Sequence, residues 1–367
     1  MKTPPKKIRY AVIATGHIVQ IAVLPAFAHA ENSELALLIT GNPEKGKKLG
    51  KKYGVPAFHY DDLEQALRDG KIDAAYIATP NTQHRAYTER CARAGVHVLC
   101  EKPMASSEAD CKAMIAACAK GGVKLMIAYR LHFDPATLAA IQLAQSGRLG
   151  EVRYFSSVFG MQAAAPNIRL EKKDGGGALL DLGVYCVNAA RYLFRAEPTE
   201  VTAFAASNRD PRFRETEEMH SAVLRFPGDR LATFTCSFGA TDNAVIEMVG
   251  TKGKLRLDPA YSYTESIAWQ LAVGDKKSER TFPRGDQFAP ELLHFSVCIL
   301  KNKPPEPDGN EGLADVRILT AIFKSAASGR AVKITPVQPQ KPIKPSQATK
   351  RPPVKKPALV KVKAPSK

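Results

Sequence analysis

The stretch YAVIATGHIVQ, residues 10–20, decides how the first third of the chain is expected to fold. Its apolar beginning is typical of a buried strand. The small residues that follow are typical of a tight turn, and the last residues are typical of the start of a helix. A strand that enters a helix through such a turn is typical of a phosphate-binding βα unit, whose usual pattern is G-x-G-x-x-G or G-x-G-x-x-A. Here the three key positions hold Ala14, Gly16 and Val19.

The middle glycine has a role with no substitute, because a side chain at Gly16 would occupy the space of a pyrophosphate. Ala14 is a one-methyl change that the turn should tolerate if the backbone angles of Ala14 are ordinary. Val19 is bulkier, and we expect it to displace the helix slightly. Taken alone, the motif leaves open whether a dinucleotide binds. If one does, the turn residues expected to contact it are Gly16, His17 and Ile18.

Short apolar segments alternate with helix-like segments from residue 8 to about residue 130. Fully apolar strands that alternate with helices predict a parallel, doubly wound sheet, which is the Rossmann-type α/β fold, over residues 8–130. Ligands of such sheets bind outside the carboxyl ends of the strands. The residues that follow each strand are therefore the candidates for binding.

Polar residues gather just after three of these expected strands. A nicotinamide pocket needs a few convergent polar groups of this kind. A single histidine such as His84 is more often a structural residue, so both roles stay open for it. The candidate cofactor-binding residues at these strand ends are Thr79, Pro80, Asn81, His84, Glu101, Lys102 and Arg130.

The end of the second expected strand indicates which dinucleotide the domain prefers. NAD sites usually place Asp or Glu there to bind the ribose 2′-hydroxyl. This chain reads LLITGNPEKGKK, with Thr40, Gly41 and Asn42 in that region and Lys45 close behind. A hydroxyl, an amide and a cation suit a 2′-phosphate, so NADP(H) is favoured over NAD(H). A lysine-rich surface helix is the alternative interpretation.

The pattern changes after about residue 150. One helix, GALLDLGVYCVNAARYLF, precedes a run of strands that mostly alternate apolar and polar residues, with short turns between them. Such alternation predicts an antiparallel sheet with helices on one face. We assign residues 131–335 to this second domain, with a role in substrate binding and oligomerisation. The uncovered face of its sheet needs a partner, which predicts a homo-oligomer.

The two ends of the chain are expected to lie outside the folded domains. Residues 1–7 form a short flexible N-terminus. Residues 336–367 contain nine Lys and Arg residues and no acidic residue, so they contribute +9 to the net charge of +17. They also contain eight of the 26 prolines. This composition predicts a disordered tail. Binding to nucleic acid or acidic lipid is the alternative to a merely solvated tail, but the tail has no aromatic residues to stack on bases, and nucleic-acid binding is not expected.

The seven cysteines indicate the cellular compartment. They form no C-x-x-C pair and mostly lie in apolar runs, which favours buried thiols in a reducing environment over disulfides or a metal site. The N-terminus lacks the uninterrupted apolar region of a secretion signal, and its longest apolar run is too short to span a membrane. We expect a cytoplasmic protein without a metal and without membrane association.

Four motifs together resemble one family of oxidoreductases, the Gfo/Idh/MocA family, which includes glucose–fructose oxidoreductase and inositol dehydrogenase. The motifs are PNTQH, EKP, YRLHFDP and GGGALLDLGVYCVNAARYL, and the resemblance covers about residues 8–335. It implies an N-terminal Rossmann domain and a C-terminal α/β domain with an open-faced, mostly antiparallel sheet. It also implies pairing of these sheets in a homodimer or homotetramer.

The resemblance also implies catalytic residues. The family's catalytic lysine matches Lys102. In place of the histidine and aspartate of the inositol dehydrogenase branch, the long helix has Tyr185 and Asn188, which is similar to the glucose–fructose oxidoreductase branch, where a tyrosine transfers the proton. Asp181 and Tyr185 are four residues apart and should share a helix face. A nearby ammonium group would favour the phenolate form of Tyr185.

The expected reaction is hydride transfer between a nicotinamide and a hydroxyl-bearing carbon of a monosaccharide or related polyol. Tyr185 would take the hydroxyl proton, Lys102 would bind the same oxygen, and Asp181 would orient the sugar or Lys102. Arg169 is a further candidate for contacting the substrate. The alternative is a non-catalytic protein that binds a cofactor or sugar and recruits a partner through its basic tail.

Overall fold

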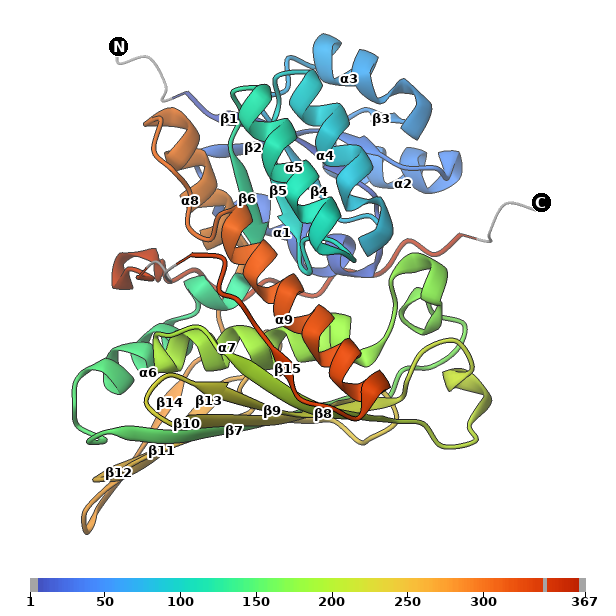
Figure 1. Cartoon of the computed structure of the whole chain (residues 1–367). Coiled ribbons are helices and arrows are strands. Elements are labelled where there is room, and N and C mark those ends of the chain that lie inside the picture. Colours follow the sequence, from blue (N-terminus) through green and yellow to red (C-terminus); the bar gives the residue numbers. More distant parts are fainter. Residues whose placement is uncertain (1–5, 339–341, 363–367) are drawn as a thin grey trace, which may run out of the picture.

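The computed structural model describes residues 6–338 and 342–362, and it has two α/β domains, one above the other in Figure 1. Of the expected flexible N-terminus, residues 1–5 lie outside the described part, and Lys6 and Lys7 form a short loop before the first strand. Both expected sheets are present. The predicted fold class, a Rossmann domain followed by an α/β domain, is confirmed.

The first sheet has six parallel strands in the order β3-β2-β1-β4-β5-β6. The pattern is that of a doubly wound fold, because the order reverses direction next to β1. Buried apolar residues fill these strands on both faces, as the near-continuous hydrophobic runs of the sequence predict. The strands are β1 (Ile8–Ile13), β2 (Ser33–Ile39), β3 (Ala57–Phe58), β4 (Ala74–Ile77), β5 (His97–Glu101) and β6 (Leu125–Ala128).

Helices cover both faces of this sheet. One core cluster contains α3 (Leu63–Asp69), α4 (His84–Arg93) and α5 (Glu108–Lys120). The other contains α1 (Leu24–Ala26), residues of α2 (Pro43–Tyr53) and, from far along the chain, α8 (Phe288–Leu300). Although α8 falls within residues 131–335, its apolar side packs on the Rossmann sheet. The predicted domain boundary at residue 130 therefore divides the sequence motifs, but it does not divide the hydrophobic cores, because α8 belongs to the core of the first domain.

The second sheet has nine strands in the order β14-β13-β12-β11-β7-β10-β9-β8-β15. All neighbours are antiparallel except β7 and β10. The sequence analysis missed the central strand β7, the strands β13 and β14 at one end of the sheet, and the short edge strand β15 at the other. The strands are β7 (Val152–Gly160), β8 (Glu200–Ala206), β9 (Met219–Phe226), β10 (Arg230–Ser237), β11 (Asn243–Gly250), β12 (Gly253–Asp258), β13 (Ile267–Val273), β14 (Lys276–Phe282) and β15 (Val332–Lys333).

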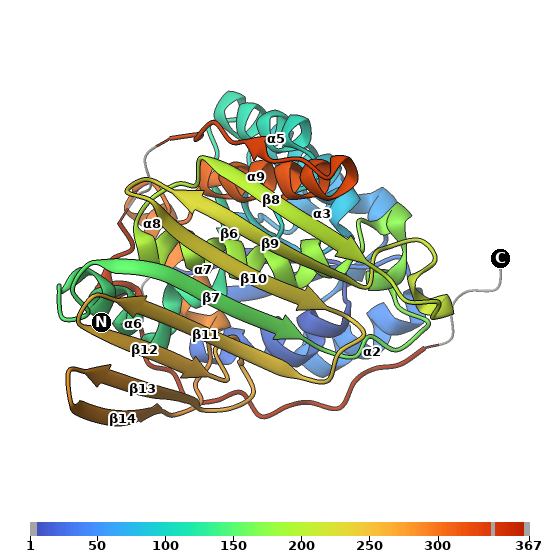
Figure 2. The same cartoon turned by 60° about the horizontal axis from the view of Figure 1, so that its bottom comes forward.

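The helices of the second domain lie on one face of this sheet. They are α6 (Pro135–Gln145), α7 (Val184–Phe194) and α9 (Gly309–Ser328), and α9 also contacts α5 of the first domain. The opposite face of the sheet carries no helix in Figure 2. Large apolar side chains are exposed on its strands, including Tyr154, Phe204, Val223 and Leu231.

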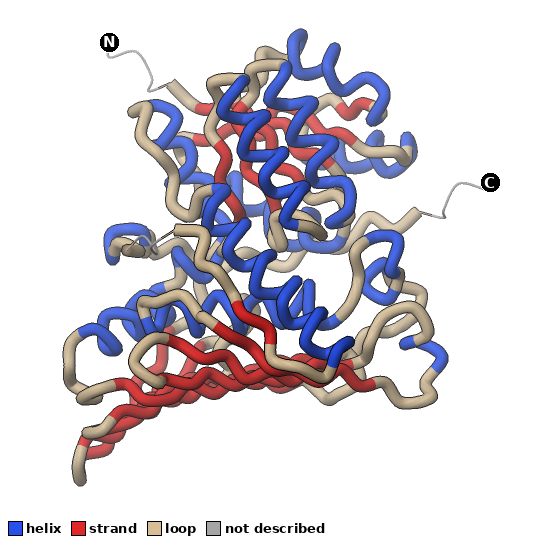
Figure 3. The backbone as a smooth tube through the Cα atoms, viewed as in Figure 1, coloured by secondary structure: helices blue, strands red, loops and turns tan. Residues whose placement is uncertain are grey.

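The C-terminal tail differs from the prediction of disorder. Its described part, residues 336–338 and 342–362, runs back over the body of the protein as an extended chain with one short helical turn, Pro345–Gln347 (Figure 3). It is held by hydrogen bonds from its side chains and backbone to residues of both domains. Composition predicted disorder because the tail has no core of its own, but the tail packs on a core made by the rest of the chain.

All seven cysteines are free and buried, as expected from their apolar surroundings. No helix in the described part of the chain is long and apolar enough to cross a membrane.

Candidate active site

The turn after β1 has a backbone that the sequence analysis did not anticipate. Ala14 has φ of 77°, in the left-handed region that glycine adopts without steric cost. Ala14 therefore lacks the ordinary backbone angles that we expected. The first position of the motif still forms the tight bend, but with an alanine held in a strained conformation.

The next positions of the turn retain the features of a phosphate-binding unit. A Cβ atom placed on Gly16 would have no atom within 4 Å, so the space that the motif reserves for a pyrophosphate is open. The Thr15 hydroxyl donates a hydrogen bond to Thr40 Oγ1 at 2.9 Å, which ties the turn to the end of β2. Val19 is fully buried and begins a π-helical turn, Val19–Val23, so the helix opens in a wider form.

The end of β2 leads directly into the N-terminus of α2. Asn42 caps this helix, with its Oδ1 accepting from the Lys45 backbone N–H at 2.9 Å. The free N–H groups and dipole at such a helix start favour an anion. Gly41 lies against the ring of Tyr60. Residues 40–43 contain no carboxylate, so this site suits a 2′-phosphate better than a 2′-hydroxyl.

The loop after β4 is held in place by His84, which begins α4. His84 is buried, and its ring nitrogens face the carbonyl oxygens of Thr79, Pro103 and Met104 at 2.9 to 3.2 Å. With both nitrogens occupied, His84 positions the two loops that follow β4 and β5, which is the structural role that had been left open for it. Thr79, by contrast, is buried with its hydroxyl unpartnered.

Pro80 and Asn81 lie at the seam between the two domains. Asn81 donates to the Gly175 carbonyl at 2.7 Å, so the loop after β4 is joined to the second domain. Glu101 ends β5 and accepts a hydrogen bond from Tyr76 at 2.7 Å. Burial raises the pKa of the Glu101 carboxyl, despite the opposing charge of Lys102 and this hydrogen bond.

Lys102 reaches across the seam to the helix that contains Asp181. Its Nζ donates to Asp181 Oδ1 at 2.7 Å and to the Asp181 carbonyl at 3.0 Å. Arg169 Nε donates to the other carboxylate oxygen at 2.6 Å. Asp181 thus holds two cations at once, one from each domain.

Electrostatics maintain the charges of this triad. Burial acts to raise the pKa of Asp181, but Lys102 and Arg169 outweigh it and hold the pKa well below its usual range. Burial likewise opposes the charge on Lys102, and Asp181 is the first of the groups that outweigh it and raise its pKa. All three groups are therefore ionised at neutral pH.

Tyr185 lies beside the triad, as expected from its spacing of four residues from Asp181. The helix begins with a π-helical turn, Leu179–Gly183, before α7. Lys102 Nζ lies 4.7 Å from the centre of the Tyr185 ring. The hydroxyl of Tyr185, however, accepts a hydrogen bond from Arg130 Nε at 3.1 Å. The cation that bonds the phenol oxygen is therefore Arg130 and not Lys102.

The predicted role of Arg130 in cofactor binding stays a prediction, and the structure adds that its side chain bonds residues of the second domain. Its guanidinium also donates to the carbonyl of Tyr261 at 2.6 Å and to Gln287. These partners come from the loop after β12 and the start of α8. Sequence reasoning missed them because neither belongs to a motif and both are distant from Arg130 along the chain.

The remaining motif positions lie outside this group. Asn188 bonds His132 at 3.0 Å and Asp315 at 2.9 Å, and so belongs to a buried polar network farther along α7. His17 is exposed on the turn, and Lys45 lies on the first turn of α2.

A Rossmann domain whose strand-end lysine meets an aspartate and a tyrosine from a second domain is typical of two-domain, nucleotide-dependent oxidoreductases. Two family models agree with this architecture: the oxidoreductase family with an NAD-binding Rossmann fold matches residues 8–129, and the GFO/IDH/MocA C-terminal domain matches residues 137–256. The chain belongs to the Gfo/Idh/MocA oxidoreductase family.

Relatives and solved structures match most of the chain. D-xylose 1-dehydrogenase [NADP(+)] of Haloarcula marismortui is 29% identical over 89% of this chain and 93% of its own length. An uncharacterised oxidoreductase of Rhizobium meliloti is 31% identical over 88% of this chain and 98% of its own. The crystal structure of aldose-aldose oxidoreductase from Caulobacter crescentus, complexed with glycerol, superposes with a TM-score of 0.86. Its sequence is 40% identical, and the match covers 90% of this chain and all of that one.

Proposed function

We propose that this protein is an NADP(H)-dependent oxidoreductase that transfers hydride between the nicotinamide and a hydroxyl-bearing carbon of a monosaccharide or related polyol. The observation that carries the proposal is the convergence of Lys102, Asp181, Arg169 and Tyr185 at the carboxyl edge of the Rossmann sheet. Ligands of such sheets bind at this edge. The relatives named for D-xylose and NADP(+), and the aldose-aldose oxidoreductase, support this substrate class and cofactor.

The residues of the first domain fit a dinucleotide. The open space at Gly16 and the start of the first helix suit the pyrophosphate, and the N-terminus of α2 with Thr40 and Lys45 suits the 2′-phosphate. When bound, the nicotinamide supplies the hydride acceptor or donor. Thr79, with its unpartnered buried hydroxyl, is a further group that could bond the cofactor.

The protein's own residues would manage the proton. In the oxidative direction the substrate hydroxyl gives its proton to the Tyr185 oxygen as the hydride leaves the same carbon. Arg130 donates a hydrogen bond to that oxygen and so holds it in position for the transfer. Lys102 would bond the substrate oxygen, with Asp181 fixing the direction of its ammonium group. Arg169 shares the Asp181 carboxylate with Lys102 and is a further candidate for contacting the substrate.

The test begins with the cofactor. Purified protein is denatured and the released nucleotide is identified by mass spectrometry, and the nucleotide-free protein is then titrated with NADPH and NADH. We expect NADP to be released, or NADPH to bind more tightly than NADH. Failure to bind either nucleotide would contradict the proposal and favour a non-catalytic role.

Turnover is then measured with a panel of aldoses and polyols in the presence of NADP(+). We expect Tyr185→Phe to lower kcat by about 10²–10⁴-fold, the usual contribution of positioned proton transfer, with no change in the folded state. Tyr261→Phe is the matched control, because its ring lies near Tyr185 but its hydroxyl bonds Ser157 at 2.6 Å. Full activity of Tyr185→Phe would exclude the assigned role.

We also propose that the protein forms a homodimer, or a tetramer built from dimers, through the uncovered face of the nine-stranded sheet. The exposed apolar side chains on β7, β8, β9 and β10 support this assignment. Several exposed large apolar side chains on one face of a sheet are typical of a protein–protein interface.

A further inference from the structure

The C-terminal segment, residues 342–362, crosses the molecule from the second domain to the dinucleotide turn of the first (Figures 1 and 3). We call this segment the C-terminal strap. It contacts the body at three places, at its beginning, its middle and its end.

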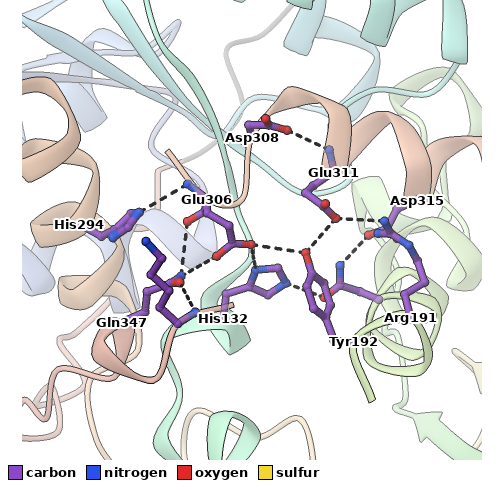
Figure 4. A network of polar contacts seen from close by, with 11 residues as sticks. His132, Arg191, Tyr192, His294, Glu306, Asp308, Glu311, Asp315 and Gln347 are labelled. Carbon is purple, nitrogen blue, oxygen red and sulfur yellow. Dashed lines mark hydrogen bonds and ion pairs between the residues drawn. The ribbon is translucent and has the colours of Figure 1, made fainter. Parts of the chain in front are cut away.

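The first contact fixes the strap to a buried polar network. Gln347 Nε2 donates to Glu306 Oε2 at 2.6 Å, and Glu306 Oε1 lies 2.9 Å from His132 Nδ1. Figure 4 shows Gln347 beside Glu306 and His132 in this network. Ile343 is buried against Leu131 and neighbouring residues of α6 and α7. The strap therefore begins from a well-packed position.

The middle contact joins the strap to the first domain and to the loop before α8. Both carboxylate oxygens of Glu31 lie 2.7 Å from Arg351 Nη2. The Asp286 backbone N–H donates to the Arg351 carbonyl at 3.2 Å, and Arg284 donates to the Val354 carbonyl at 2.8 Å. These bonds direct the chain along the edge of the Rossmann domain.

The last contact lies at the dinucleotide turn itself. The Val360 N–H donates to Gln20 Oε1 at 2.8 Å, and the other end of the same amide donates to the Thr15 carbonyl at 3.0 Å. Gln20 is only 5% exposed, so this bridge between strap and turn is shielded from water. Lys52 of α2 reaches the Ala358 carbonyl at 3.5 Å, so the strap extends from the turn towards α2.

The chemistry of the strap suits an anionic ligand beneath it. It has no acidic residue, and Lys355, Lys356 and Lys361 lie in the part that crosses the turn. Burial, followed by the charges of Arg169 and Lys356, lowers the pKa of His17 on that turn. Cations from the strap and from the second domain thus act on the same point of the turn, where a phosphate would relieve their repulsion.

The strap leaves the expected phosphate position unfilled. The space beside Gly16 is open even though the strap is in place. Five prolines lie within the strap, and they restrict its free conformations: Pro342, Pro345, Pro352, Pro353 and Pro357. Ordering the strap over a ligand therefore costs less entropy than ordering a flexible tail would.

We propose that the C-terminal strap closes over the bound dinucleotide and retains it in its site from one turnover to the next, with Lys356 contributing positive charge to the binding of its phosphates. This inference rests on the proposed function, because it requires a dinucleotide at the turn. It adds a binding element from outside both family domains.

The test measures the rate at which bound NADPH leaves the protein, by following the fluorescence of NADPH after a large excess of NADP(+) is added. A chain that ends after Ala348 keeps the Gln347 contact but lacks the strap over the turn. We expect its NADPH to dissociate roughly tenfold faster or more, the effect of losing one charge-assisted contact. A chain that ends after Val362 is the matched control and should release NADPH at the full-length rate.

Two point substitutions test the individual contacts in the full-length chain. Val360→Pro removes the N–H that bonds Gln20 and should accelerate release, whereas Val362→Pro, for which no such bond is described, should not. Lys356→Gln should accelerate release most at low salt, where charge is least screened. Lys350→Gln, which removes a lysine beside the middle contact and not at the turn, is its control.

The outcomes separate the two proposals. If the full-length protein binds no NADPH, both the proposed function and the strap inference fail. If it binds NADPH and the chain ending at Ala348 releases it at an unchanged rate, the function stands and the strap inference is overturned. Tighter binding by that shortened chain would also overturn it, since the strap would then be a competitor of the cofactor.

Discussion

At the scale of single residues, the dinucleotide turn shows that a fold can keep its geometry after losing the residue that best suits it. The motif has alanine where glycine is usual, and the backbone of Ala14 adopts the left-handed conformation all the same. The hydrogen bond from the Ala14 N–H to the Ile39 carbonyl at 2.9 Å holds it in place. The surrounding sheet therefore imposes the conformation.

Ala14→Gly should stabilise the protein. A left-handed non-glycine residue costs about 1–2 kcal/mol, and glycine offsets part of the gain through its greater freedom when unfolded, so we expect a net rise of about 0.5–1 kcal/mol in the free energy of unfolding. Chemical denaturation measures it. Ala11→Gly, in the middle of β1, is the control and should be destabilising. A loss of stability in Ala14→Gly would show that the turn is not strained.

Asp181→Asn should remove a pH-dependent contribution to stability. The pKa of Asp181 is lowered by folding, so its contribution is present above about pH 4, the ordinary value, and is lost as the pH falls through the folded pKa. The pKa of Lys102 is raised, so its share is present below about pH 10.4 and is lost as the pH rises through the folded pKa. At neutral pH both shares are intact.

We therefore expect Asp181→Asn to lower the free energy of unfolding by about 2–3 kcal/mol at pH 7, because two largely buried cations lose their partner. Denaturation across pH 3–8 measures the difference from the unaltered protein, which should shrink as the pH falls below about 4. Glu171→Gln, which removes an exposed pair with Lys173, should show no such dependence. A difference that is constant with pH would contradict the ionic role of Asp181.

At the scale of elements, α7 and α9 are joined by a buried charge cluster. Arg191 of α7 is 1% exposed and bonds Asp315 at 2.7 Å, Glu311 at 3.0 Å and Glu197 at 2.7 Å. One guanidinium thus serves three carboxylates, of which Figure 4 shows the two on α9, Glu311 and Asp315. Neither helix could keep these acids buried without it.

Arg191→Met should destabilise the protein by about 3–5 kcal/mol, because it leaves buried carboxylates without a counter-charge. Urea denaturation is the measurement. Arg225→Met is the control, since Arg225 also pairs with a carboxylate, Glu200 at 3.3 Å, but on the exposed surface, where a pair contributes about 1 kcal/mol at most. Equal effects of the two substitutions would show that burial does not determine the contribution of Arg191.

At the scale of the whole molecule, the nine-stranded sheet has one face packed by helices and one face without them. Phe204 of β8 is 73% exposed on the second face. Cross-strand neighbours extend the apolar surface, since Leu231 of β10 lies opposite Tyr154 of β7. If this face packed against the same face of a second copy, the exposed apolar side chains of both chains would be buried in one symmetric interface.

Phe204→Asp should therefore shift the protein towards monomers, because it places a charge at the proposed interface. Light scattering coupled to size-exclusion chromatography measures the molar mass at several concentrations. Leu300→Asp is the matched control: Leu300 is also exposed, at 42%, but lies at the end of α8 on the first domain. An unchanged mass for Phe204→Asp, or a monomeric unaltered protein, would contradict the proposed interface.

Local periodicity and the motifs at strand ends predicted the two sheets, the βα turn, and the shared helix face of Asp181 and Tyr185. The resemblance to the family added the expectation that Lys102 lies near these two residues. The sequence did not determine β7, whose sequence combines bulky and small residues on both faces and becomes a central strand through its neighbours β10 and β11. Composition likewise could not show where the tail packs.

The groups that meet across long separations in the chain could be identified from the folded structure but not from the sequence. Arg130 bonds Tyr185, α8 packs on the first sheet, and Val360 meets Gln20, 340 residues earlier. Local sequence patterns do not predict such pairs, because within its own segment each partner cannot be distinguished from an ordinary surface or core residue. Contacts of this kind form when the completed core fixes the positions of segments distant in sequence, which is why the fold could be predicted more fully than the site.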